Sequence, residues 1–124
     1  MASHKIVHWE LMGPDAPALN SFYHDLFGWK SEEVPGFGGY SMVPAEDTGI
    51  GGAIGAGNEH MPSYQAMYIE VDSVDEHLAK AEAGGAKTVQ ERTVIPGMVI
   101  FGMFSDPAGN LVGLVEAETP PASE

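Results

Sequence analysis

The stretch FYHDLFGW, residues 22–29, decides how the first part of the chain is interpreted. Five apolar residues, one leucine before this stretch and four within it, recur at i, i+3, i+4, i+7 and i+8. They are Leu19, Phe22, Tyr23, Leu26 and Phe27. This is the spacing of one apolar helix face. Asp15 is a suitable N-cap, and Gly28 is a residue type that commonly ends helices. We therefore predict a helix over Asp15–Phe27, preceded by a strand over Lys5–Met12.

The order of elements predicted in the first half returns in the second half. Ser73 and Glu76 form a capping box, which predicts a helix over Val74–Ala83. Residues 49–55 (GIGGAIG) align with residues 109–115 (GNLVGLV) at an offset of sixty residues. The other predicted strands are Trp29–Val34, Tyr40–Val43, Ile50–Ala56, Gln65–Val71, Lys87–Val94, Met98–Phe104 and Leu111–Glu116. We infer a duplicated βαβββ unit, with copies in residues 5–57 and 65–116.

The composition limits the classes of function. The 124 residues allow one compact domain, predicted at residues 1–117, with a flexible tail at residues 118–124. Five Lys and Arg against 18 Asp and Glu give a formal charge of −13, which repels nucleic-acid phosphates and anionic membrane surfaces. The absence of Cys excludes disulfides and thiol chemistry. Because residues 1–12 lack the apolar run of a signal peptide, we expect a cytoplasmic protein without nucleic-acid or membrane partners.

Two tandem βαβββ units, the FYHDLFGW stretch and the sequence SDPAGN at residues 105–110 together resemble the vicinal-oxygen-chelate superfamily. This superfamily includes glyoxalase I, bleomycin-resistance proteins and extradiol dioxygenases, and the resemblance covers Ile6–Glu116. It implies an α+β fold in which the two units form curled half-barrel sheets around a cavity, with the helices outside. It also implies a homodimer, because single-domain members commonly pair.

The resemblance further implies where a metal would bind. Metal-dependent members place one His, Glu or Gln on each of the first, fourth, fifth and eighth strands, and the matching positions here are His8, Ala53, Ala66 and Gly113. Alanine and glycine have no side-chain donor, and one imidazole cannot hold a divalent ion against water. We therefore expect no metal cofactor. A displaced metal site drawn from His8, Glu10, Glu70 and His60 stays open as an alternative.

Strand alternation predicts which residues face the implied cavity. It places His8, Glu10 and Met12 on one face of the first strand, and it places Ala66, Tyr68 and Glu70 on one face of the fifth. An apolar pocket with a few polar anchors is typical of small-molecule sites. The predicted ligand-binding residues are His8, Glu10, Met12, Tyr68, Glu70, Phe101, Met103 and Leu111. A solvated or strand-bonded role for the two carboxylates stays open.

Three functions are compatible with these residues. The first and favoured one is a metal-free protein that binds a small apolar or aromatic molecule, neutral or cationic, as bleomycin-resistance members do. The second is a lyase, isomerase or dioxygenase with an atypical metal site. The third is a metal-free enzyme in which Glu10 or Glu70 is the catalytic general base. Whether the chain is an enzyme therefore stays open at this stage.

Overall fold

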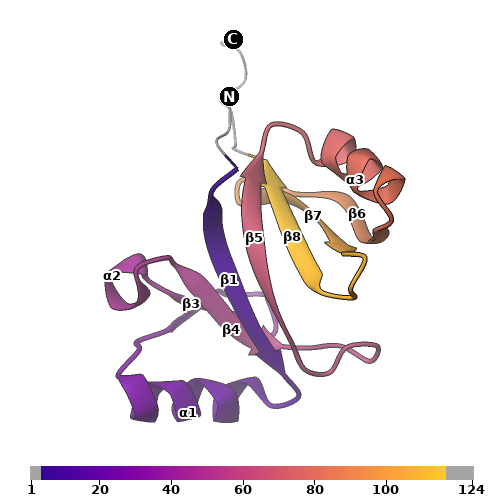
Figure 1. Cartoon of the computed structure of the whole chain (residues 1–124). Coiled ribbons are helices and arrows are strands. Elements are labelled where there is room, and N and C mark those ends of the chain that lie inside the picture. Colours follow the sequence, from indigo (N-terminus) through magenta and orange to yellow (C-terminus); the bar gives the residue numbers. More distant parts are fainter. Residues whose placement is uncertain (1–3, 117–124) are drawn as a thin grey trace, which may run out of the picture. The chain divides into compact units, whose positions relative to one another are not determined.

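A computed structural model describes residues 4–116, and each half has the order strand, helix and three strands, with one additional short helix in the first half (Figure 1). The elements are β1 (Ile6–Gly13), α1 (Ala16–Phe27), β2 (Glu32–Glu33), β3 (Ser41–Val43), α2 (Ala45–Thr48), β4 (Gly52–Ala56), β5 (Tyr64–Val71), α3 (Val74–Ala83), β6 (Lys87–Ile95), β7 (Val99–Ser105) and β8 (Leu111–Glu116). The predicted α+β class is confirmed. The predicted flexible tail lies outside the described residues. No helix in the described range is long and apolar enough to cross a membrane.

The structure divides into two compact units, which we describe separately. The N-terminal unit comprises residues 7–67, and the C-terminal unit comprises residues 68–116 together with residues 4–6. In the N-terminal unit the strand order is β2-β3-β4-β1. β1 pairs in parallel with β4, whereas β3 pairs antiparallel with both β2 and β4. This register places Trp9 opposite Gly52 and Glu10 opposite Ala53.

Local chemistry sets both ends of α1. The Asp15 carboxylate accepts a hydrogen bond from the Ala18 backbone N–H at 3.0 Å, and so caps the helix. At the other end, Gly28 adopts a left-handed conformation with φ 76°, and its N–H donates to the His24 carbonyl. The predicted helix is thus confirmed, and Asp15 is its cap rather than its first residue.

In the C-terminal unit the strand order is β5-β8-β7-β6, and β7 pairs antiparallel with both β6 and β8. Helix α3 begins after Ser73, whose hydroxyl accepts a hydrogen bond from the Glu76 N–H at 3.2 Å. The helix packs on the sheet through a buried cluster formed by Val71, Val74, Leu78 and Leu114. Gly102 on β7 permits this approach, because a Cβ at that position would contact Val74 too closely.

Three details of the N-terminal unit differ from the prediction. The strand expected over Trp29–Val34 is reduced to Glu32–Glu33, because the Lys30 N–H donates to the Asp47 carboxylate at 3.0 Å instead of joining a strand. The helix α2 follows β3 and was not predicted. The apolar face of α1 is also incompletely covered, since Phe22, Leu26 and Phe27 are more than half exposed.

Candidate functional site

Three polar side chains of the N-terminal unit form a hydrogen-bonded chain against β1. The Tyr40 hydroxyl donates to Glu10 Oε2 at 2.6 Å, and His8 Nε2 lies 3.0 Å from the same hydroxyl. Glu10 is only 7% exposed, although it is a carboxylate. His8 and Glu10 occupy alternate positions of β1 and so reach one tyrosine from the same face of the strand. We call these three residues the β1 polar cluster.

Burial and the charge of Glu10 fix the protonation states around this cluster. Burial lowers the pKa of His8, and this effect exceeds the raising effect of Glu10. Burial and the adjacent Glu10 raise the pKa of Tyr40 far above its usual value, and the same two causes raise the pKa of Tyr64 to about 12. At neutral pH the imidazole is therefore neutral, and both phenols keep their protons.

These protonation states determine the direction of the hydrogen bonds. A phenol carries one proton, and that of Tyr40 is directed at Glu10. The Tyr40 oxygen must then accept from His8, so Nε2 carries the imidazole proton. If Glu10 takes up a proton from a bound molecule, its bond to Tyr40 can reverse, and the carboxylic acid then donates to the phenol oxygen. The cluster can thus act as a strong acceptor for a ligand's N–H or O–H, and Glu10 can also take up a proton beside the Tyr40 hydroxyl.

The positions that the family resemblance implies for metal ligands do not suit a metal. Ala53 is fully buried opposite Glu10, and Ala66 is 7% exposed, so neither position presents a donor. At Gly113 a Cβ would overlap the ring of Tyr68, so no side chain fits there. Among residues 4–116, no group of three or more His, Asp or Glu residues could hold a metal ion. The residues present therefore do not fit the metal that some superfamily members use.

The remaining predicted ligand-binding residues lie mostly in the C-terminal unit. Tyr68 and Met103 are both buried, and the Tyr68 hydroxyl donates to the Met103 sulfur at 3.7 Å. Glu70, Phe101 and Leu111 are half-buried, and the Glu70 backbone N–H donates to the Lys5 carbonyl. Met12 is in the N-terminal unit, beside Gly55 and Tyr40. The eight predicted residues thus fall into two groups, one in each unit.

Tyr40 is the residue that sequence reasoning missed, because we counted it only as the start of a strand. It follows Gly38 and Gly39, which both adopt positive φ angles of 60° and 92°. Two such glycines before an aromatic residue indicate a tight change of chain direction that aims the side chain. This was the available signal, but nothing local indicated that the ring would reach β1.

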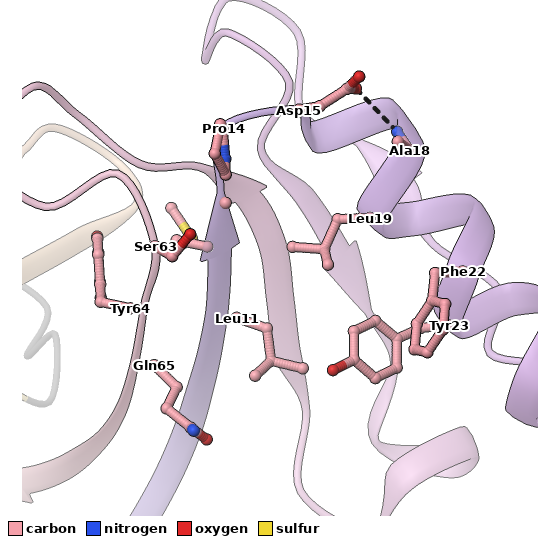
Figure 2. Close-up of a pocket in the computed structure, with 12 residues that line it drawn as sticks. Leu11, Pro14, Asp15, Ala18, Leu19, Phe22, Tyr23, Ser63, Tyr64 and Gln65 are labelled. Atoms are coloured by element: carbon pink, nitrogen blue, oxygen red, sulfur yellow. Dashed lines mark hydrogen bonds between the residues drawn. The ribbon is translucent and has the colours of Figure 1, made fainter.

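A cleft of about 710 Å³ lies beside α1 in the same unit. Figure 2 shows Leu11 of β1 facing Leu19 and Tyr23 of α1 across it. Ser63, just before β5, and Gln65, near the beginning of β5, border the other side. Of the predicted ligand-binding residues, only Met12 lines this cleft. The cleft itself was not anticipated from the sequence.

Curated proteins of known sequence resemble this chain over most of its length. The chain is 29% identical over 117 residues to the anthracycline biosynthesis protein DnrV of Streptomyces peucetius, an alignment that covers 82% of this chain and 42% of that protein. The chain therefore spans about two fifths of the length of the curated relatives it matches.

Solved structures share the fold at low sequence identity. Methylmalonyl-CoA epimerase from Mycobacterium tuberculosis superposes with a TM-score of 0.65 at 16% identity, covering 99% of this chain and 93% of that one. A glyoxalase/bleomycin resistance protein/dioxygenase superfamily member from Vibrio splendidus 12B01 superposes with a TM-score of 0.63 at 15% identity, covering 93% and 100%. A family model matches residues 5–114, nearly the whole described range. The chain thus belongs to the Glyoxalase/Bleomycin resistance protein/Dioxygenase superfamily, as the sequence motifs indicated.

Proposed function

We propose that this chain is a metal-independent superfamily member that binds a small, neutral or cationic molecule through the β1 polar cluster. The observation that carries the proposal is the 2.6 Å hydrogen bond from Tyr40 to the buried Glu10 carboxylate. A carboxylate that is held in place before a ligand arrives loses little entropy on binding. Its remaining lone pairs can accept hydrogen bonds from an amine or a hydroxyl group.

The charge of the N-terminal unit supports a cationic or neutral ligand. Residues 7–67 contain Lys30 as their single Lys or Arg, against eight Asp and Glu residues. An anionic ligand would have no basic partner there and would be repelled by the surrounding carboxylates. Superfamily members bind small-molecule ligands, and Met12 is the predicted apolar ligand-binding residue that lies in the same unit as the β1 polar cluster.

Calorimetric titration with bleomycin and with an anthracycline tests the proposal, since both probes combine aromatic rings with a positive charge. We expect binding that is insensitive to a chelator and at least roughly tenfold weaker in Glu10→Gln, because a charged hydrogen bond is lost. The matched control is Glu46→Gln, which removes an exposed carboxylate from the same unit. Equal affinities of Glu10→Gln and the wild type would show that Glu10 does not anchor the ligand.

A second candidate function is proton abstraction by Glu10, favoured by the continuous Glu10–Tyr40–His8 hydrogen bonding. Glu10 would take a proton from an activated C–H of the ligand, and the Tyr40 hydroxyl would stabilise the product by hydrogen bonding. In D₂O this activity exchanges the ligand proton for deuterium, which NMR detects. Glu10→Gln should abolish the exchange, whereas a pure binding protein would show none in the wild type.

We also propose that the chain forms a homodimer. The edge strand β6 of the C-terminal unit presents Val89 and Val94 at 43% and 50% exposure, and Met98 in the following turn is 50% exposed. An exposed apolar edge strand is a common pairing surface. Light scattering should give a dimer mass for the wild type and a monomer mass for Val94→Lys. A monomeric wild type would contradict the proposal.

The cytoplasmic location stays a prediction.

A further inference from the structure

The geometry points to a second small-molecule site in the cleft beside α1, separate from the β1 polar cluster. All residues that line the cleft belong to the N-terminal unit. Leu11 faces this cleft, whereas its neighbour Glu10 points to the other face of β1, because successive strand residues alternate. The volume of about 710 Å³ falls within the roughly 300–1,000 Å³ that is usual for small-molecule sites. Most of the β1 lining of the cleft thus comes from the face opposite the β1 polar cluster, and Met12 near the end of the strand is the lining residue from the face of Glu10.

The floor of the cleft is apolar and its rim offers polar groups that the protein does not use. Leu11 and Leu19 form the floor, and the Tyr23 hydroxyl and the Gln65 amide lie on either side of Leu11 (Figure 2). Within residues 4–116, the Tyr23 hydroxyl and the side chains of Ser63 and Gln65 take part in no hydrogen bond. They are therefore available to a ligand, at the cost of displacing water only.

One wall of the cleft consists of aromatic rings that are already fixed in position. The Tyr23 ring stacks on Trp29 with centroids 5.5 Å apart and planes at 14°, and it meets Phe22 edge-on at 5.0 Å. Trp29 in turn packs against Trp9 at 5.3 Å. A ring held by neighbours on two sides provides a flat apolar surface without further ordering on binding. The wall therefore favours a ligand that is itself aromatic.

The charges at the cleft favour an uncharged ligand. No Lys or Arg lines it, so an anion would find no partner. Its single lining carboxylate, Asp15, already accepts the Ala18 N–H that caps α1, so a cation would compete with that helix cap. The site fits a small uncharged aromatic molecule that carries a hydroxyl or carbonyl oxygen. The oxygen would bond the Tyr23 hydroxyl or the Gln65 amide, and the ring would cover Leu11 and Leu19.

The test is an NMR titration of the isotope-labelled whole chain with 2-naphthol, followed through backbone amide signals. Saturable shifts at Leu11, Leu19 and Gln65 are expected, and the charged analogue 2-naphthoate should bind at least roughly tenfold more weakly. Tyr23→Phe should weaken 2-naphthol about three- to tenfold, because one hydrogen bond is lost. Ala18→Phe should abolish binding by filling the cleft, whereas Ala79→Phe on the exposed side of α3 should leave it unchanged.

Three results would overturn the proposal. The first is a set of shifts confined to Glu10, Tyr40 and Gly55, which would place 2-naphthol at the β1 polar cluster. The second is the absence of saturable shifts, and the third is a concentration-dependent shift at Leu11 and Phe22 without 2-naphthol, which would show that a second copy of the chain covers the cleft. If Ala18→Phe fails to fold, the Tyr23→Phe comparison decides, because it removes only an exposed-edge hydroxyl. Failure here leaves Glu10-dependent binding unaffected, so the two proposals are separable.

Discussion

At the scale of single residues, the Tyr40 hydroxyl donates a hydrogen bond to a buried carboxylate, Glu10, in the N-terminal unit. Tyr40→Phe deletes this hydroxyl and leaves Glu10 Oε2 without that donor. We expect a loss of about 1.5–3 kcal/mol in the free energy of unfolding, the range for hydrogen bonds to charged groups. Urea denaturation measures this loss. Tyr23→Phe is the matched control and should change the stability by less than about 0.5 kcal/mol. Equal effects of the two variants would contradict the assignment.

His8 gives the stability a pH dependence whose sign follows from its lowered pKa. The unfolded ring has a pKa near 6.5 and the folded ring a lower one, so the unfolded state binds more protons between the two values. The free energy of unfolding should therefore fall as the pH drops from 6.5 through the folded pKa, and His8→Gln should remove this fall. NMR titration of the ring should report a pKa below 6.5. His60→Gln, in an exposed loop, should keep the pH dependence of the wild type.

The residues that share a strand were predictable, whereas their partner was not. His8 and Glu10 lie on one face of β1 because strand alternation is a local rule. Tyr40 reaches them from 30 residues away along the chain. That contact depends on the turn through Gly38 and Gly39 and on the pairing of β3 with β4, which are properties of the folded unit. The spacing of residues in the sequence does not by itself predict non-local contacts of this kind.

At the scale of elements, both units place a glycine beneath an aromatic ring of the paired or neighbouring strand. The Trp9 ring covers Gly52 in the N-terminal unit, and the Tyr68 ring covers Gly113 in the C-terminal unit. A Cβ at either glycine would overlap ring atoms. We expect Gly52→Ala and Gly113→Ala each to lower the free energy of unfolding by about 1–3 kcal/mol.

Gly51→Ala is the matched control for these substitutions, because its Cβ would meet its nearest neighbours at an ordinary 3.6 Å. Thermal unfolding of the three variants provides the comparison. A Gly113→Ala variant as stable as Gly51→Ala would mean that the Tyr68 ring does not lie over β8.

The start of α3 depends on Glu116, the last residue of β8. Its carboxylate accepts the Val74 N–H at 2.9 Å and pairs with Arg92 at 2.9 and 3.2 Å. The Arg92 guanidinium, followed by the Val74 N–H, lowers the pKa of Glu116 below 4.5. The stabilisation is thus present above pH 4.5 and is lost as the pH falls through the folded pKa.

Glu116→Gln should accordingly be less stable than the wild type at pH 7, and the difference should shrink toward pH 3. Chemical denaturation at several pH values measures it. Glu91→Gln, which changes an exposed carboxylate on β6, serves as the control and should show no such convergence. A difference that is constant between pH 7 and pH 3 would exclude the ionised Glu116 as its source.

The elements differ in how well the sequence predicted them. Helix α3 and strand β8 have the predicted bounds, because caps, periodicity and glycine stops lie within the segment itself. β2 is four residues shorter than predicted, since its backbone is diverted to the Asp47 carboxylate. The exposure of Phe22 and Leu26 was also unforeseen, because helical spacing identifies an apolar face but not the area available to cover it.

At the scale of the whole molecule, the formal charge of −13 acts on every surface residue at once. Carboxylates repel one another more strongly in the compact state, and salt reduces this repulsion as the Debye length falls from about 30 Å at 0.01 M to about 8 Å at 0.15 M. The free energy of unfolding should therefore increase with NaCl over this range. A variant in which exposed Glu32, Glu33 and Glu46 are replaced by Gln should respond less to salt. A stability that decreases with NaCl would contradict the argument.

The sequence predicted the fold class better than the site. Duplication, helix caps and the two motifs sufficed for the superfamily, since these are patterns within the chain. The unsuitability of the metal positions also followed from residue types alone. The cleft beside α1 did not, because it is lined by residues within 11–23 and 63–65, which are far apart in the sequence.

The Tyr68 ring over Gly113 has a consequence for how this chain could change over generations. Introducing a metal-binding glutamate at Gly113 is blocked while the ring is present, because its Cβ already overlaps ring atoms. Removing the ring first would empty a buried position and cost about 3–5 kcal/mol, much of a small domain's stability. Either order of single mutations therefore passes through a destabilised variant. A carboxylate ligand at Gly113 would thus require both substitutions at once.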